Sequence, residues 1–120
     1  MKILVTSTGE TLDSSLDSRY GRAAKFILFD TVSGRYESID NTRGMNALQG
    51  AGIQAAETVA RLGPQCVITG HCGPKAFRVL SAAGIPIFTT DAANVAEALE
   101  KFRSGQLVEA RDADVEGHWE

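Results

Sequence analysis

The chain contains little cysteine, because Cys66 and Cys72 are the only two in its 120 residues. Two cysteines are too few for the disulfide scaffold of a small secreted domain. Only three apolar residues separate Lys2 from Thr6, a run too short for the core of a secretory signal or for a membrane span. We therefore expect a cytoplasmic protein with two free thiols and no membrane partner.

Basic charge is not in excess either, since 12 basic and 15 acidic residues leave a net charge of -3. Without a broad basic field, nucleic acid is not an expected partner. The apolar share of 43% and the charged share of 22% are those of an ordinary globular domain and exclude a disordered chain. The length suits one domain, which we place at residues 1–110, with a flexible acidic tail at 111–120.

Apolar patterning along the chain predicts five strands and three helices. The first three strands read as a meander, and the later β-α units require right-handed crossovers and parallel pairing. This predicts an α/β, ribonuclease-H-like fold with a five-stranded mixed sheet in the order 3-2-1-4-5 and helices on both faces. Strands are predicted at residues 2–6, 25–30, 36–40, 65–69 and 86–89, and helices at 47–62, 74–83 and 95–102.

In that strand order, the sheet changes its direction of winding between the first and the fourth strand. Ligands of open α/β sheets collect outside the carboxyl ends of the strands at such a point. Ser7 follows the first strand, and a turn at residues 70–74 follows the fourth. Pro74 suits the first position of a helix, whose positive end favours an anion and should lower the pKa of Cys72.

The 70–74 turn has three interpretations. It can be a plain strand-to-helix connection in which Cys72 is a small core residue. His71-Cys72 and Arg78 also have the H-C-x5-R spacing of cysteine phosphatases, in which a thiolate attacks phosphorus and arginine holds the phosphate oxygens. The helical pattern, however, places Arg78 on the solvent-facing side. A thiol next to an imidazole also suits copper, zinc or iron-sulfur species, although two ligands do not complete a tetrahedral site.

Positive charge is available in two irregular segments, which contain Arg19, Arg22 and Arg43. If both segments fold over the switch point, their arginines surround the Cys72 turn and form an anion pocket. The first strand has no carboxylate, which argues against the two-metal chemistry of a nuclease.

Three segments, taken in order, resemble a known family. They are GRAAKF at residues 21–26, QGAGIQAA at 49–56 and ITGHCGPKAF at 68–77. Together they are similar to the dinitrogenase iron-molybdenum cofactor biosynthesis family, from residue 2 to about residue 107. The single-domain form with Gly-His-Cys-Gly looks most like the orange-protein type of this family, which is associated with a molybdenum-copper sulfide cluster.

The resemblance implies a protein that is not an enzyme and that binds or carries an anionic metal-sulfur cluster, or its precursor, in cofactor assembly. The cluster would be a metal sulfide of the molybdenum-copper or iron-molybdenum type. The implied partners are cluster-assembly or cluster-accepting proteins, and the chain would be a monomer or weak homodimer. A cysteine-dependent, phosphatase-like enzyme is the alternative. The implied binding residues are Ser7, Arg19, Arg22, Asn41, Gln49, Gly50, His71, Cys72 and Gly73, with Cys72 and His71 as candidate metal ligands.

Overall fold

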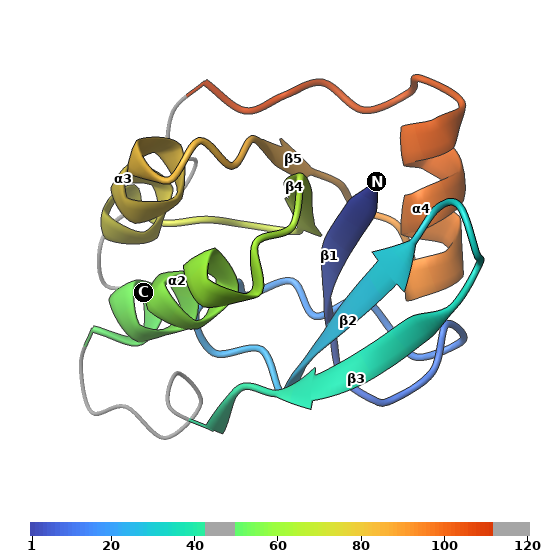
Figure 1. Cartoon of the computed structure of the whole chain (residues 1–120), viewed down its shortest axis with the longest axis horizontal. Coiled ribbons are helices and arrows are strands. Elements are labelled where there is room, and N and C mark those ends of the chain that lie inside the picture. Colours follow the sequence, from blue (N-terminus) through green and yellow to red (C-terminus); the bar gives the residue numbers. More distant parts are fainter. Residues whose placement is uncertain (43–49, 112–120) are drawn as a thin grey trace.

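A computed structural model describes residues 1–42 and 50–111 of the chain (Figure 1). Within these ranges the elements follow the predicted order closely. They are β1 Lys2–Ser7, β2 Lys25–Asp30, β3 Tyr36–Asp40, α2 Ala51–Leu62, β4 Cys66–Thr69, α3 Pro74–Ala82, β5 Ile87–Thr89 and α4 Val95–Arg103.

The sheet has the predicted order β3-β2-β1-β4-β5. Strand β1 lies at its centre, antiparallel to β2 and parallel to β4. Val5 illustrates the register, since it lies opposite Ile27 on one side and Ile68 on the other. The mixed, ribonuclease-H-like sheet is thereby confirmed, and the carboxyl ends of β1 and β4 lie next to each other at the switch point.

Helices cover both faces of the sheet, as predicted, with α2 and α3 on one face and α4 on the other (Figure 1). Because side chains alternate along a strand, β1 supplies both cores. Leu4 packs in the core beneath α2 and α3, whereas Ile3 and Val5 pack in the core beneath α4. Within the described residues, no helix is both long enough and apolar enough to cross a membrane.

Helix α2 differs from its prediction at the amino end. It begins at Ala51 after Gly50, whose φ of 73° is left-handed and breaks the helical backbone. The predicted start at residue 47 lies outside the described residues, as do Arg43, Gln49 and the tail at 112–120. Helix α3 begins at Pro74 as predicted, and α4 is capped by Asn94, whose side chain accepts a hydrogen bond from the Glu97 N–H at 2.8 Å.

The Cys66 thiol lies in the core beneath α4, where burial raises its pKa from about 9 to about 11. The folded protein therefore keeps the proton more strongly than the unfolded chain. The stability that this provides is complete below pH 9 and is lost as the pH rises to about 11. We expect the free energy of unfolding to fall over that range by up to about 2 kcal/mol more in the wild type than in Cys66→Ala. Urea denaturation at pH 8, 9, 10 and 11 measures this difference, and parallel pH profiles of the two proteins would contradict it.

Candidate functional site

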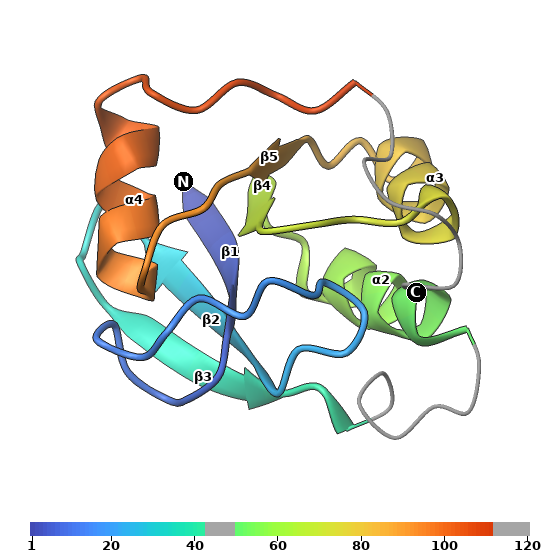
Figure 2. The ribbon, with the colours of Figure 1, turned by 180° about the vertical axis from the view of Figure 1, so that it is seen from behind.

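The connection between β1 and β2, residues 8–24, crosses the carboxyl end of the sheet toward α2 (Figure 2). Isolated bridges pair Ser7 with Leu16 and Arg19 with His71. The Tyr20 N–H also donates to the His71 carbonyl at 3.2 Å. The predicted folding of the Arg19 segment over the 70–74 turn is therefore present.

Two glycines allow this connection to approach the rest of the fold. A Cβ at Gly70 would lie 2.7 Å from the Ser18 Cα and 2.8 Å from the Ser18 carbonyl oxygen. A Cβ at Gly21 would lie 2.7 Å from the backbone nitrogen of Gly52, in α2. Both distances are too short for a real side chain. The backbone of the connection is thus in direct contact with the 70–74 turn at one place and with α2 at the other.

The bridge between the Arg19 segment and the 70–74 turn places four side chains in two pairs. Neighbours in a parallel bridge face the same side, and successive residues face opposite sides. Arg19 and His71 are both exposed, and we call them the outward pair. Tyr20 and Cys72 are each only 2% exposed, and we call them the inward pair. The irregular segment therefore contributes to the core through Tyr20.

The inward pair places a phenol and a thiol, both titratable groups, in that core. The Cys72 thiol lies 3.7 Å from the Gly73 carbonyl oxygen. Burial, followed by the nearby Cys72, raises the pKa of the Tyr20 hydroxyl well above its ordinary value of about 10. That hydroxyl is buried and has no hydrogen-bond partner among the described residues. A thiol that is 2% exposed contacts an external ligand only after part of this core opens.

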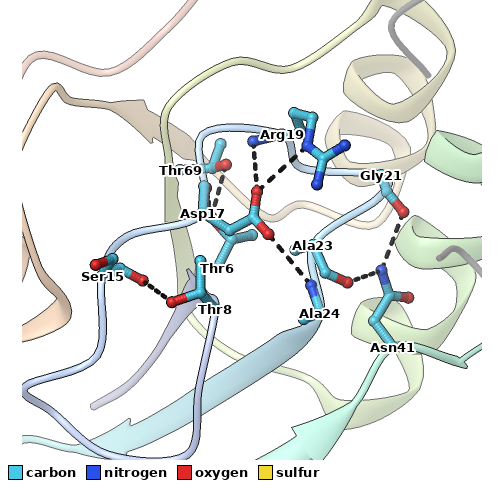
Figure 3. Close-up of polar contacts among 10 residues, drawn as sticks. All are labelled: Thr6, Thr8, Ser15, Asp17, Arg19, Gly21, Ala23, Ala24, Asn41 and Thr69. Carbon is cyan, nitrogen blue, oxygen red and sulfur yellow. Dashed lines mark hydrogen bonds and ion pairs between the residues drawn. The ribbon is translucent and has the colours of Figure 1, made fainter.

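Two further predicted residues stabilise loops within the protein. The Ser7 hydroxyl is buried and donates to the Gly9 carbonyl at 2.9 Å. Asn41 is 1% exposed, and its side-chain nitrogen donates to the carbonyls of Gly21 and Ala23 at 3.0 and 2.8 Å. Figure 3 shows Asn41 beside the Gly21 to Ala24 segment. Their side-chain hydrogen bonds therefore shape the connection from within the fold.

The remaining predicted residues that the structure describes lie in the connection or at the amino ends of α2 and α3. Arg22 is half-buried in the connection, Gly73 precedes α3 and Gly50 precedes α2. Gln49 lies outside the described residues, so its predicted role stays a prediction. Direct ligation of a metal by Cys72 and His71 also stays a prediction.

Asp17 is the residue of this region that the sequence analysis missed. Its side chain is 7% exposed, and it accepts hydrogen bonds from the N–H groups of Arg19 at 3.1 Å and Ala24 at 3.3 Å (Figure 3). The Arg19 Nε lies 3.6 Å from the same carboxylate. An aspartate that accepts the N–H two residues later forms an Asx turn. The sequence Asp17-Ser18-Arg19 is compatible with such a turn, which was the only local indication of this role in a segment without periodicity.

A cleft of about 690 Å³ opens at the carboxyl ends of β4 and β5. Arg19 adjoins this cleft through its neighbours Ser18 and His71, which both line it. The cleft combines hydroxyl groups, an imidazole, apolar patches and the Lys101 ammonium group, which lies 3.5 Å from the Asp91 carboxylate in the same lining. It is lined by Leu16, Ser18, Gly70, His71, Thr89, Thr90, Asp91, Ala92, Lys101, Gln106 and Leu107. A hollow of about 610 Å³ involves Lys2 and Arg35 near the β2-β3 hairpin, away from the switch point.

Known proteins resemble this chain in sequence and in fold. The family model described as dinitrogenase iron-molybdenum cofactor matches residues 1–105. The chain belongs to this family. The apo form of the orange protein from Desulfovibrio gigas is 37% identical and superposes with a TM-score of 0.92, covering 95% of this chain and 96% of that one. A NifB-like protein of the DUF35 family from Thermotoga is 31% identical, with a TM-score of 0.79 and coverage of 90% and 91%. An uncharacterized protein of Methanocaldococcus jannaschii is 27% identical over 111 residues, 89% of this chain and 93% of its own.

The family assignment confirms the resemblance seen in the sequence and relates the chain to cofactor biosynthesis of the iron-molybdenum type. The donor set limits how a cluster could be held. Among residues 1–42 and 50–111, no three His, Cys, Asp or Glu side chains gather closely enough to hold a metal ion. A covalently ligated cluster normally needs several thiolates. Within the described residues, a cluster would therefore have to be held largely by charge and by hydrogen bonds.

The phosphatase spacing does not assemble into a phosphatase site. Cys72 is buried beside Tyr20, whereas Arg78 is exposed on α3. A cysteine phosphatase needs the thiolate and the guanidinium on the same phosphate group.

Proposed function

We propose that the chain binds an anionic metal-sulfur cluster or its precursor, without catalysing turnover, and exchanges it with cluster-assembly or cluster-accepting proteins. The observation that carries the proposal is the outward pair: Arg19 and His71 lie side by side, both exposed, next to the cleft at the carboxyl ends of β4 and β5. The family assignment and the likeness to the orange protein support the class of cargo.

Electrostatics at this edge favour an anion. The Arg19 side chain is 53% exposed, and its contact with Asp17 is made through Nε. The terminal nitrogens of the guanidinium are therefore the atoms that meet a ligand. Helix α3 begins just after the turn, with Pro74 first and no acidic residue in its first turn, so its positive end is not neutralised by its own side chains.

Anaerobic reconstitution tests the proposal. Apo protein incubated with molybdate, copper and sulfide should yield a chromophore that stays with the protein through gel filtration, with molybdenum and copper measured in the same fractions. Arg19→Glu should reduce the retained chromophore about tenfold or more, because it reverses the exposed charge of the outward pair. Arg22→Glu should have a smaller effect, because Arg22 is half-buried.

Arg78→Glu is the matched control, since it makes the same charge change on an exposed part of α3 outside the outward pair. It should retain the wild-type amount of chromophore. Equal losses in Arg19→Glu and Arg78→Glu would show that net charge, and not this site, governs binding. A colourless wild type that hydrolyses an aryl phosphate and loses that activity in Cys72→Ser would replace the proposal with the thiol enzyme.

A further inference from the structure

We propose that Asp17 is the positioning residue of the anion site, because its carboxylate holds the Arg19-Tyr20 segment in register with His71-Cys72. This inference rests on the proposed function for what the site binds, but the placement of the segment can be tested without any cargo. A carboxylate so close to an anion site weakens binding through charge repulsion alone. A favourable effect of Asp17 on binding must therefore act through geometry.

The backbone of Asp17 is fixed to the switch point itself. Its N–H donates to the Thr6 carbonyl at 3.0 Å, and its carbonyl accepts from the Thr6 hydroxyl at 2.6 Å. The hydroxyls of Thr6 and Thr69 are hydrogen-bonded to each other at 2.8 Å and join the ends of β1 and β4. Asp17 therefore has a defined place relative to both central strands, and Figure 3 shows it between these threonines and Arg19.

The Asp17 carboxylate in turn holds residues 19–24 by hydrogen bonds. One oxygen accepts the Arg19 N–H and lies 3.6 Å from the Arg19 Nε, while the other accepts the Ala24 N–H. These contacts fix both ends of the 19–24 segment, and they are charge-assisted hydrogen bonds in a largely buried setting. Arg19 is thereby directed toward solvent, and Tyr20 is directed into the core that contains Cys72.

The alkylation rates of the two buried cysteines report whether Asp17 holds the 19–24 segment in place. Cys72 lies in the core beneath α2 and α3 with Tyr20, whereas Cys66 lies in the core beneath α4. Local release of the 19–24 segment exposes Cys72 alone, and global unfolding exposes both thiols. The ratio of the two alkylation rates therefore separates loss of positioning from loss of stability.

The test compares Asp17→Asn with Asp13→Asn, which makes the same charge change at an exposed position of the same connection. Asparagine has the size of aspartate, but its NH2 group cannot accept the Ala24 N–H while its oxygen accepts the Arg19 N–H. In the apo protein treated with iodoacetamide, we expect Asp17→Asn to raise the Cys72 rate about tenfold and to leave the Cys66 rate unchanged, as read by mass spectrometry. After molybdate, copper and sulfide reconstitution, the same variant should lose its chromophore at lower NaCl than the wild type.

Asp17→Glu is the second variant, because it keeps the charge and moves the carboxylate by one methylene. A positioning role predicts that Glu also accelerates Cys72 alkylation and weakens retention, whereas a purely electrostatic role predicts wild-type behaviour. An unchanged Cys72 rate in both variants would overturn the inference, and so would equal acceleration at Cys66 and Cys72. A wild type that retains no chromophore would overturn the proposed function, while the alkylation ratio would still decide whether Asp17 positions the segment.

Discussion

Gly70→Ala should destabilise the protein by about 2 kcal/mol and abolish retention of the reconstituted chromophore. The new Cβ would meet the Ser18 Cα at 2.7 Å and the Ser18 carbonyl oxygen at 2.8 Å. Overpacking of this kind typically costs about 1–3 kcal/mol, and here the structure can relieve it by moving the 17–20 backbone away from the turn. Such a movement separates Arg19 from His71. Urea denaturation and anaerobic gel filtration measure the two effects.

A double variant shows whether the new Cβ clashes with backbone atoms of Ser18 or with its side chain. Adding Ser18→Gly to Gly70→Ala should not restore binding, because the two closest atoms of Ser18 are backbone atoms that glycine also has. Gly34→Ala is the control for stability, since its φ of 74° makes alanine cost about 1–2 kcal/mol in the β2-β3 hairpin, far from the site. It should retain the chromophore. Rescue by Ser18→Gly, or wild-type binding by Gly70→Ala, would contradict the proposed contact.

Much of the fold is predictable from local patterns. The apolar run at 25–30, the short turn with Gly34 and the return segment at 36–40 indicated the limits of the hairpin to the residue. Proline at position 74 marked the start of α3 for a local reason as well. The start of α2 was less visible, because the small residues around Gly50 continue the helical pattern while the left-handed backbone of Gly50 interrupts it.

The site was predictable only where it follows from the order of the strands. The switch point follows from strand order, so Ser7 and the 70–74 turn were correctly placed at the same edge of the sheet. The burial of Cys72 depends on Tyr20, which reaches it from a segment that has no periodicity. Arg19 and His71 are 52 residues apart, and their pairing leaves no periodic pattern in either segment. Composition also does not distinguish an exposed arginine from one that is half-buried.

Asn41→Asp should be among the most damaging single substitutions in this part of the chain, with a loss of about 3 kcal/mol. The side-chain nitrogen of Asn41 donates to two carbonyls, those of Gly21 and Ala23, and the residue is 1% exposed. Aspartate replaces this donor with an oxygen, so that both carbonyls lose their partner and face a buried charge. Asn41→Ala should cost less, because it also removes a side-chain oxygen that has no hydrogen-bond partner among the described residues. Urea denaturation of the three proteins measures this order of stability.

The matched control is Gly63→Ala, at the carboxyl end of α2, where a φ of 66° makes alanine cost about 1–2 kcal/mol and an added Cβ meets no other atom. This change destabilises the protein away from the connection, so the chromophore should be retained. For Asn41→Asp, retention should fall even at temperatures where the protein is still folded, because the 21–24 segment that Asn41 holds leads directly back to Arg19 and Asp17. An Asn41→Asp protein with wild-type stability would exclude a structural role for this side chain, and equal chromophore loss in Gly63→Ala would show that retention reports overall stability and not the placement of the connection.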